Sequence, residues 1–300
     1  MQNIVGVVGL GIMGGAFAKN LREAGFAVVG CDVSEKAQAA LKERGGTVVA
    51  TPREVAERTP VIILSLPTVK AVDDVVSGPN GLVHSHAKGR VMIEMGTMPL
   101  DVKQRAHDAL QAAGHTLLDC PVSGTGAQAW NKDLVVLASG DEAAYKKCLY
   151  VFEGMSRRIC YLGPFGNGSK MKFIANHLVT IHNVAAGEAI ALGIKSGLDP
   201  QLVFDTLSDS AGSSRMFQVR GPLMVEDAYD KVTATHKTHT KDLEIIKAFA
   251  DGLAMPTPLF AAASQYYYAA IAQGLGNLDT ASVCKVSENL GGVARNKKGK

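Results

Sequence analysis

A glycine-rich turn near the N-terminus constrains the fold of this chain more than any other feature. Gly9-Leu10-Gly11-Ile12-Met13-Gly14 follows the apolar run Ile4–Val8 and opens an amphipathic segment, Ile12–Ala24. A strand that enters a helix through such a turn is typical of a βαβ unit that binds a dinucleotide. The first glycine allows the tight turn, the second lets the backbone approach a pyrophosphate, and the third lets helix and strand pack closely. The N-terminus of the helix then faces the anion.

An acidic residue, Asp32, ends the second expected strand, Ala27–Cys31. A carboxylate at this position can accept a hydrogen bond from the 2′-hydroxyl of the adenine ribose, and it repels a 2′-phosphate. The turn and the acid together predict NAD as the cofactor, although the nearby Lys36 leaves NADP open. The structural alternative is an ordinary glycine-rich turn followed by an exposed aspartate that caps the next helix.

The rest of the first half alternates short β-branched runs with amphipathic segments, which indicates βαβ units and a mostly parallel sheet. Further strands are expected at Thr47–Val49, Val61–Ser65, Val91–Glu94, Thr116–Leu118, Leu134–Ala138 and Arg158–Leu162. Further helices are expected at Glu35–Arg44, Pro52–Glu57, Thr68–Val76, Pro99–Ala113 and Asp141–Phe152. Right-handed crossovers make this an α/β fold with a doubly wound sheet of the Rossmann type.

The pattern changes after Gly163-Pro164-Phe165-Gly166. A long apolar helix is expected over Gly168–Ser196. Its stretch Phe173–Gly187 contains no Asp, Glu, Lys or Arg, so we expect that stretch to be buried nearly all round. More helices follow at Pro200–Ser208, Arg215–Met224, Lys241–Ala250, Pro258–Gln273 and Thr280–Glu288. We therefore predict a dinucleotide-binding domain over residues 1–163 and an all-helical domain for substrate binding and oligomerisation over residues 164–300.

Charge and composition exclude several classes of protein. The 300 residues are 47% hydrophobic and 20% charged, which fits a folded two-domain chain and excludes a disordered one. The net charge of +3 is spread along the chain apart from a short basic tail, so nucleic-acid binding is not favoured. The uncharged stretch Gly252–Leu278 is interrupted by prolines and polar residues, and a buried or interface helix is expected there instead of a membrane span.

Cysteine spacing and the N-terminus bear on the compartment. The five cysteines are far apart, odd in number and never in a Cys-x-x-Cys spacing, which favours a reducing compartment and argues against a disulfide framework or structural zinc. No export signal is visible at the N-terminus. His236-x-x-His239 has a possible metal spacing, but no acidic third ligand accompanies it, so no metal site is predicted. These two histidines lie just before Lys241, and either a solvated helix face or a position facing the substrate is expected for them. A cytoplasmic protein is expected.

Three further turns follow the ends of expected strands, where a doubly wound sheet binds its ligands. Leu66-Pro67-Thr68 follows the fourth strand and Gly96-Thr97 the fifth. After the sixth strand, Ser123-Gly124-Thr125-Gly126 offers backbone N–H groups and two hydroxyls that suit a carboxylate. Plain turn chemistry explains all three segments equally well.

Lys172 and Asn176 are the candidate catalytic pair. They lie four residues apart near the start of the long apolar helix, hence on one face of it. Burial would lower the pKa of the lysine from about 10.4 and allow it to exchange a proton with a substrate hydroxyl, while the amide holds the same oxygen. The alternative is a lysine at a helix end whose ammonium group extends to water.

Four segments together resemble the β-hydroxyacid dehydrogenase family, which includes 3-hydroxyisobutyrate and L-threonate dehydrogenases. They are Gly9–Gly14, Asp119–Gly124, the segment Gly166–Lys172 with Asn176, and Lys241-Asp242-Leu243. The resemblance covers nearly the whole chain. It implies a Rossmann domain, a long interdomain helix and an all-α C-terminal domain used in dimer or tetramer contacts.

The resemblance also implies roles for single residues. Lys172 would be the general acid/base with Asn176 assisting it, and Ser123 and Gly124 would bind the substrate carboxylate. Lys241 would close over cofactor and substrate, and Thr97 would lie beside the nicotinamide. Thr125 stands where many relatives have a second glycine, and Ala175 where many have a first asparagine, which puts the identity of the substrate in doubt.

The expected activity is NAD-dependent oxidation of a small 3-hydroxycarboxylic acid to a semialdehyde or 3-keto acid by a homodimer or homotetramer. A reductase of semialdehydes or imines on the same scaffold is the nearer alternative, although related imine reductases generally lack the lysine. A non-catalytic dinucleotide-binding module is the alternative from a different class.

Overall fold

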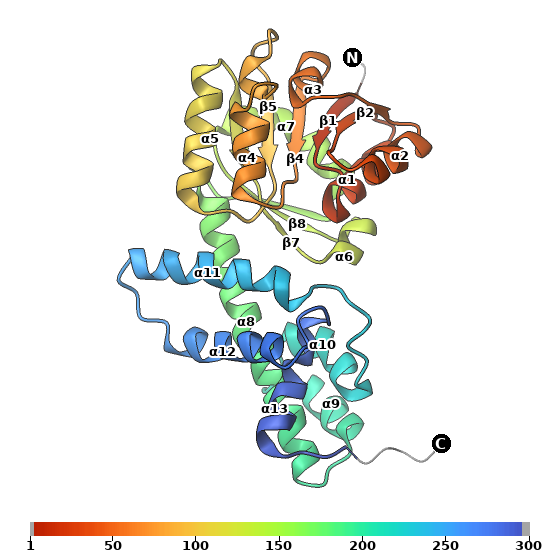
Figure 1. Ribbon diagram of the computed structural model, residues 1–300, viewed down its shortest axis with the longest axis vertical. Helices are drawn as coiled ribbons and strands as arrows, with labels where there is room; N and C mark the ends of the chain where they lie inside the picture. Colours follow the sequence, from red (N-terminus) through yellow and green to blue (C-terminus); the bar gives the residue numbers. More distant parts are fainter. Residues whose placement is uncertain (1–2, 296–300) are drawn as a thin grey trace. The chain divides into compact units, whose positions relative to one another are not determined.

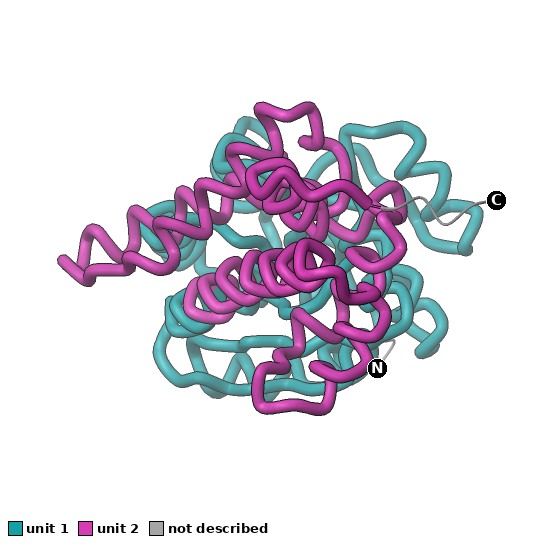
Figure 2. Tube along the Cα trace, turned by 90° about the horizontal axis from the view of Figure 1, so that it is seen from below, with its two compact units in different colours: residues 1–172 teal, residues 173–300 magenta. Residues whose placement is uncertain are grey.

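The computed structural model describes residues 3–295, and the chain divides into two compact units, Met1–Lys172 and Phe173–Lys300 (Figure 2). The division lies inside the long helix α8 (Asn167–Lys195), whereas the predicted boundary lay before this helix. The physical reason is that the first turn of α8 is hydrogen-bonded to unit 1, through Gly168 and Ser169.

Unit 1 contains a six-stranded parallel sheet in the order β3-β2-β1-β4-β5-β6 (Figure 1). The strands are β1 (Ile4–Val8), β2 (Ala27–Cys31), β3 (Thr47–Val48), β4 (Val61–Leu64), β5 (Val91–Glu94) and β6 (Thr116–Asp119). Chain order reverses between β1 and β4, so the predicted doubly wound Rossmann sheet is confirmed. The ends of β1 and β4 at this switch point are where such folds bind ligands.

Most helices of unit 1 begin at a residue whose side chain caps the helix. The helices of this unit are α1 (Ile12–Glu23), α2 (Glu35–Glu43), α3 (Pro52–Arg58), α4 (Val69–Ser77), α5 (Leu100–Ala112), α6 (Gly126–Trp130) and α7 (Glu142–Met155), with a 3-10 turn at Leu82–His84. Side chains of Ser34, Thr51, Thr68 and Asp141 accept backbone N–H groups at the starts of α2, α3, α4 and α7. Such caps satisfy donors that a helix start leaves unpaired.

A second, three-stranded sheet, β7-β8-β9, was not anticipated as a separate sheet. Its strands are β7 (Val122–Ser123), β8 (Val135–Ala138) and β9 (Arg158–Tyr161), with β7 antiparallel to β8 and β9 parallel to it. The sequence did not predict β7 or α6, because two and five residues are too short for a periodic signal.

The core of unit 1 lies on both faces of the large sheet, because neighbouring residues of a strand point to opposite faces. Val7, Ile63 and Ile93 belong to one buried cluster. Val8 and Leu64 belong to the other, beneath α3, α4 and α5. Burial on both faces explains why the strands read as continuous apolar runs.

Unit 2 contains most of α8, then α9 (Pro200–Ser208), α10 (Arg215–Glu226), α11 (His236–Gly252), α12 (Pro258–Ala272), a 3-10 turn (Thr280–Ser282) and α13 (Val283–Gly291). The predicted helical second half is confirmed. Its regular β-structure within residues 173–295 is a single isolated bridge, Thr235 to Asp279.

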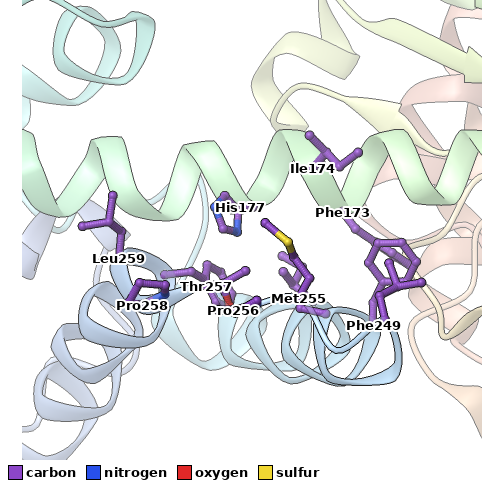
Figure 3. Close-up of a pocket in the computed structure, with 13 residues that line it drawn as sticks. Phe173, Ile174, His177, Phe249, Met255, Pro256, Thr257, Pro258 and Leu259 are labelled. Atoms are coloured by element: carbon purple, nitrogen blue, oxygen red, sulfur yellow. The ribbon is translucent and has the colours of Figure 1, made fainter.

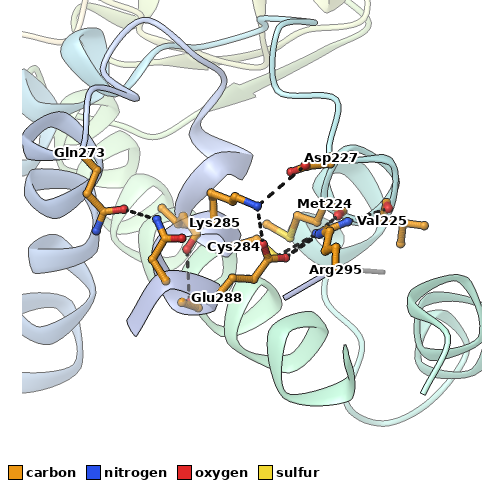
Figure 4. Close-up of polar contacts among 11 residues, drawn as sticks. Met224, Val225, Asp227, Gln273, Cys284, Lys285, Glu288 and Arg295 are labelled. Atoms are coloured by element: carbon orange, nitrogen blue, oxygen red, sulfur yellow. Dashed lines mark hydrogen bonds and ion pairs between the residues drawn. The ribbon is translucent and has the colours of Figure 1, made fainter. Parts of the chain in front are cut away.

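Buried ion pairs join the helices of unit 2. Arg295 donates from Nε to Glu288 Oε1 at 2.8 Å and from Nη1 to the carbonyl oxygen of Val225 at 2.9 Å (Figure 4). Glu288 is fully buried, so this contact ties α13 to the end of α10. Arg220 on α10 pairs with the buried Asp279 before the last 3-10 turn.

We expected helix α8 to be buried nearly all round, but part of its surface is exposed to solvent. Ile174 and Leu178 are 52% and 48% exposed, although Phe173 and Thr180 are buried. The uncharged stretch therefore has one apolar face that packs in the core and another apolar face that is exposed to solvent. By length and composition alone α8 could also cross a membrane, but core helices meet the same criterion and 44% of its most apolar window is buried.

Candidate functional site

The three glycines of the N-terminal turn have three different surroundings. Gly9 adopts φ +87°, and a Cβ there would lie 2.3 Å from the carbonyl oxygen of Ser65. A Cβ at Gly14 would lie 1.8 Å from the carbonyl oxygen of Gly9. A Cβ at Gly11, in contrast, would meet no atom within 4 Å. Gly9 and Gly14 thus serve the fold, while the backbone at Gly11 faces open space that a pyrophosphate can approach.

The start of α1 fits an anion. Gly11 is its N-cap, and no side chain caps the helix, unlike most other helices of unit 1. The Asp32 carboxylate accepts the Leu10 N–H at 2.5 Å and the Ser34 N–H at 2.7 Å, so it lies against the same turn. These residues fit a dinucleotide, with phosphates at the helix start and a ribose at Asp32.

The turns after β4 and β5 lie side by side in unit 1. A Cβ at Gly96 would lie 3.2 Å from the carbonyl oxygen of Leu66. Leu66 is buried, Pro67 is exposed, and Thr97 is half-buried. The structure thus places Gly96 beside Leu66 at the carboxyl edge of the sheet, and Pro67 and Thr97 are their neighbours in the sequence.

The Ser123–Gly126 turn lies against the N-terminal turn, because a Cβ at Gly126 would come within 2.5 Å of Ile12 Cγ2. Gly124 adopts φ +140°, and a Cβ there would lie 2.4 Å from Leu134 Cδ2. A side chain at this position would require a left-handed backbone and a movement of the Leu134 side chain. The proposed carboxylate-binding turn and the dinucleotide turn are therefore neighbours, which the sequence alone could not show.

Thr125 has a structural task that the sequence analysis missed. Its hydroxyl accepts the Gln128 N–H at 3.3 Å, and its own N–H donates to Gln128 Oε1 at 2.9 Å. This reciprocal capping box starts α6. The hydroxyl and amide that we assigned to a substrate nest at this residue are thus engaged within the protein.

A buried cluster of charges lies beneath this edge of the sheet. Lys103 Nζ lies 2.5 Å from Glu94 Oε2 and 2.7 Å from Asp119 Oδ1. All three side chains are at most 1% exposed. Burial raises the pKa of Glu94, although Lys103 opposes this. Burial would lower the pKa of Lys103, but the two carboxylates outweigh it and raise that pKa above its usual value.

The same cluster holds the start of α8. Asp119 accepts the Ser169 N–H at Oδ2 and the Ser169 hydroxyl at Oδ1, both at 2.8 Å. Asp119 and Ser169 lie within the motifs that identify the family resemblance but had no predicted role, and neither Glu94 nor Lys103 was a predicted site residue. Lys103 is the fourth residue of an amphipathic helix, and nothing in its pattern distinguishes it from a solvent-exposed lysine.

Lys172 and Asn176 lie one turn apart on α8. Lys172 is half-buried and is the last residue of unit 1, whereas Asn176 is 8% exposed and belongs to unit 2. Asn176 Nδ2 donates to Asp242 Oδ2 at 2.9 Å, and Lys241 Nζ lies 3.1 Å from Asp242 Oδ1. Asp242 thus connects two predicted residues. It lay within the quoted Lys241-Asp242-Leu243 segment but was not itself a candidate.

The two histidines before Lys241 have different surroundings. His236 is fully buried, and its Nε2 lies 2.7 Å from Ser282 Oγ. Burial, with a smaller effect of His239, lowers the pKa of His236 to about 4. His236 therefore faces neither solvent nor substrate, contrary to both interpretations that we considered. His239 Nε2 lies 2.9 Å from Thr180 Oγ1. Across residues 3–295 no three His, Cys, Asp or Glu side chains gather as a metal site would require.

An apolar cavity of about 360 Å³ lies within unit 2 between α8, α11 and the start of α12 (Figure 3). Phe173, His177, Phe249 and Met255 are among its lining residues. Burial lowers the pKa of His177, whose ring stacks on Phe260. No carboxylate, lysine or arginine lines this cavity. It therefore lacks the groups that would bind a carboxylate or take up a proton at neutral pH.

Comparisons with known proteins agree with this geometry. Residues 4–163 match the family described as the NAD-binding domain of 6-phosphogluconate dehydrogenase. Residues 166–287 match the family described as NAD-binding of NADP-dependent 3-hydroxyisobutyrate dehydrogenase.

Individual relatives match along nearly their whole length. The chain is 33% identical to L-threonate dehydrogenase of Cupriavidus necator, over 95% of this chain and 96% of the relative. It is 32% identical to glyoxylate/succinic semialdehyde reductase 1 of Arabidopsis thaliana, over 93% and 96%. A crystal structure of 3-hydroxyisobutyrate dehydrogenase from Salmonella typhimurium superposes with a TM-score of 0.84 at 29% identity, over 94% of this chain and 99% of that one. Since both halves match and the Rossmann turn has the geometry of a dinucleotide site, the chain is an NAD(P)-binding oxidoreductase of the β-hydroxyacid dehydrogenase family.

Proposed function

We propose that this protein oxidises a small 3-hydroxycarboxylic acid with NAD, giving a semialdehyde or 3-keto acid. The observation that carries the proposal is the position of Lys172. It lies one helical turn after Ser169, which is bonded to Asp119 at the carboxyl end of β6. A lysine is thereby held at the edge of the sheet that also carries the dinucleotide turn. This placement favours proton transfer over a purely structural role.

The cofactor, when bound, would accept a hydride from the substrate carbon that bears the hydroxyl group. Lys172, in its neutral form, accepts the hydroxyl proton as the C–H bond breaks and the C=O bond forms. Asn176 Nδ2 donates one hydrogen to Asp242 and carries a second, which we assign to the same substrate oxygen. In the reverse direction Lys172, as an ammonium group, returns the proton.

The substrate carboxylate is assigned to Ser123 and Gly124. Their turn packs on Ile12 of the dinucleotide turn, which supports a substrate next to the cofactor. Lys241 is assigned to cofactor and substrate binding because of the resemblance of its Lys241-Asp242-Leu243 segment to the family. Thr125 is assigned to capping α6 and to shaping the turn, on the basis of its two bonds to Gln128.

The preference for NAD over NADP rests on Asp32. Its carboxylate lies beside the dinucleotide turn, where a 2′-phosphate would meet a like charge. The family includes NADP-dependent members by description, so this preference is a proposal about this chain.

Turnover of Lys172→Ala tests the mechanism. We expect kcat for NADH formation to fall by about 10²–10⁴-fold, because the proton acceptor is lost. The assay follows NADH absorbance with branched, linear, dicarboxylic and polyhydroxylated 3-hydroxyacids. Lys170→Ala is the matched control, since Lys170 is an exposed lysine on the same turn. Near-normal turnover by Lys172→Ala would contradict the mechanism.

Reduction of a semialdehyde is the second candidate for the physiological direction. The similarity to a glyoxylate/succinic semialdehyde reductase supports it. Initial rates with NADH or NADPH and a semialdehyde, compared with the oxidation rates at the same pH, distinguish the two directions. Absence of turnover in both directions, with NAD still bound, would favour a non-catalytic dinucleotide-binding module.

We further propose a homodimer or homotetramer that acts in a reducing compartment such as the cytoplasm. Exposed apolar side chains gather in unit 2, among them Ile174, Leu178, Met255 and Leu259, and this supports a subunit interface there. The five cysteines are unpaired thiols, which fits a reducing compartment. Light scattering of the purified protein tests the oligomeric state.

A further inference from the structure

The start of α8 depends on contacts to residues far away in the sequence. Ser169 bonds twice to Asp119, and the Gly168 N–H donates to Ser139 Oγ at 2.9 Å. A Cβ at Gly168 would lie 2.3 Å from the carbonyl oxygen of Leu137 and 2.6 Å from that of Asp119. The first turn of α8 is thus in direct contact with the backbone at the ends of β6 and β8. Its position in unit 1 leaves little freedom.

Asp119 is itself held by a chain of buried contacts. Lys103 binds Asp119 and Glu94 together and donates to the carbonyl oxygen of Gly96 at 2.9 Å. Glu94 in turn accepts the Gly96 N–H at 2.8 Å. These buried contacts therefore link the ends of β5 and β6, and the turn before Thr97, to the first turn of α8.

Such a cluster is a poor way to gain stability. Burying a lysine and two carboxylates carries a large desolvation cost for each ion, and well-packed apolar residues often stabilise a fold equally well. Buried polar groups have directional bonds, however, and they define one arrangement where apolar contacts allow several. A role in fixing geometry explains their presence better than a role in stability.

We propose that Glu94, Lys103, Asp119 and Ser169 are positioning residues for Lys172. Through Ser169 they set where the first turn of α8 stands on the sheet edge, and hence where the Lys172 amine meets the substrate hydroxyl. This inference rests on the proposed function of Lys172. None of the four residues is assigned a contact with substrate.

Ser169→Ala is the mildest test. It removes the hydroxyl bond to Asp119 and leaves the backbone N–H bond in place. We expect kcat to fall about tenfold while the KM for substrate and the Kd for NAD stay near wild type, because a small misplacement of a reacting group is costly. Asp119→Asn, which also removes the charge, should lower kcat by about 100-fold. Asp119→Asn should also shift the pH dependence of kcat that is due to Lys172 to lower pH. The reason is that the variant lacks a negative charge near the helix start, and such a charge favours the ammonium form of the lysine.

Ser156→Ala is the matched control. Ser156 is also buried in unit 1 and its hydroxyl bonds to the carbonyl oxygen of Phe152 at 2.7 Å, at the end of α7. Its variant should lose comparable stability in urea while keeping kcat and its pH profile. A decrease of kcat in Ser169→Ala that Ser156→Ala does not share supports the inference, whether or not Asp119→Asn folds.

Wild-type kcat and pH profile in Ser169→Ala, with Lys172→Ala inactive, would overturn the inference and leave the proposed function standing. An active Lys172→Ala would instead refute the mechanism itself. The two failures are therefore distinguishable.

Discussion

Replacement of Asp32 by asparagine tests the cofactor assignment directly. The carboxylate accepts the Leu10 N–H at 2.5 Å and the Ser34 N–H at 2.7 Å. Asparagine keeps one side-chain acceptor oxygen and the size of the side chain, but it loses the negative charge. One of the two backbone N–H groups therefore loses its acceptor, so the turn should lose some stability, and the site loses its charged acceptor for the ribose hydroxyls.

The magnitude follows from the kind of bond that is lost. A hydrogen bond to a charged group contributes about 1.5–3 kcal/mol. At about 1.4 kcal/mol for each factor of ten, the Kd for NAD should rise by about 10- to 150-fold. The Kd for NADP should stay constant or fall, because the charge that faces a 2′-phosphate is gone. The ratio of the two constants should therefore decrease by at least about tenfold.

Isothermal titration calorimetry with both cofactors at fixed ionic strength measures this ratio. Asp141→Asn is the matched control, because Asp141 also accepts a backbone N–H, from Ala144 at 2.7 Å, at a helix start in unit 1. It should lose similar stability without any change in cofactor preference. An unchanged ratio in Asp32→Asn would refute the assignment of Asp32 to the ribose.

Two further predictions concern the glycine turn and His236. Gly11→Ala should fold like wild type but bind NAD at least about tenfold more weakly. Gly14→Ala should unfold at a lower urea concentration, because its Cβ would overlap the Gly9 carbonyl oxygen. Equal urea midpoints for the two variants would contradict this prediction. Burial lowers the pKa of His236 to about 4 in the folded protein. Between about pH 6.5 and pH 4 this histidine is therefore protonated in the unfolded chain but neutral in the folded one. Stability should therefore fall as the pH decreases from 6.5 towards 4, by roughly 2 kcal/mol at pH 5 from this residue. Urea midpoints at pH 7 and 5 should show a smaller decrease in His236→Gln than in wild type or in the exposed-site control His84→Gln; the same decrease in all three would show that another group is responsible.

The comparisons connect the two halves of the molecule to one family, but the assignment of single residues depends on geometry. Ser123 and Gly124 are assigned to the carboxylate because their turn packs on the dinucleotide turn. Asn176 is assigned to a substrate oxygen because Asp242 holds its amide. Each assignment can therefore fail separately while the membership of the family stands.

Local patterns in the sequence were sufficient for most of the architecture. Strands such as Ile4–Val8 and Val91–Glu94 are short, apolar and bounded by turn residues, and helices such as Pro200–Ser208 begin at a capping residue. These signals act over a few residues, so they survive in the sequence. The same holds for Gly9 and Gly14, where the turn itself requires glycine.

Only the tertiary structure decided which distant residues meet. Asp119 and Ser169 are fifty residues apart, and nothing local indicates that one carboxylate caps the helix that carries Lys172. The burial of His236 and the exposed face at Ile174 were predicted wrongly for the same reason. Whether a side chain on a helix faces core or solvent depends on the neighbours that the fold brings to it, and a pattern within one helix does not contain those neighbours.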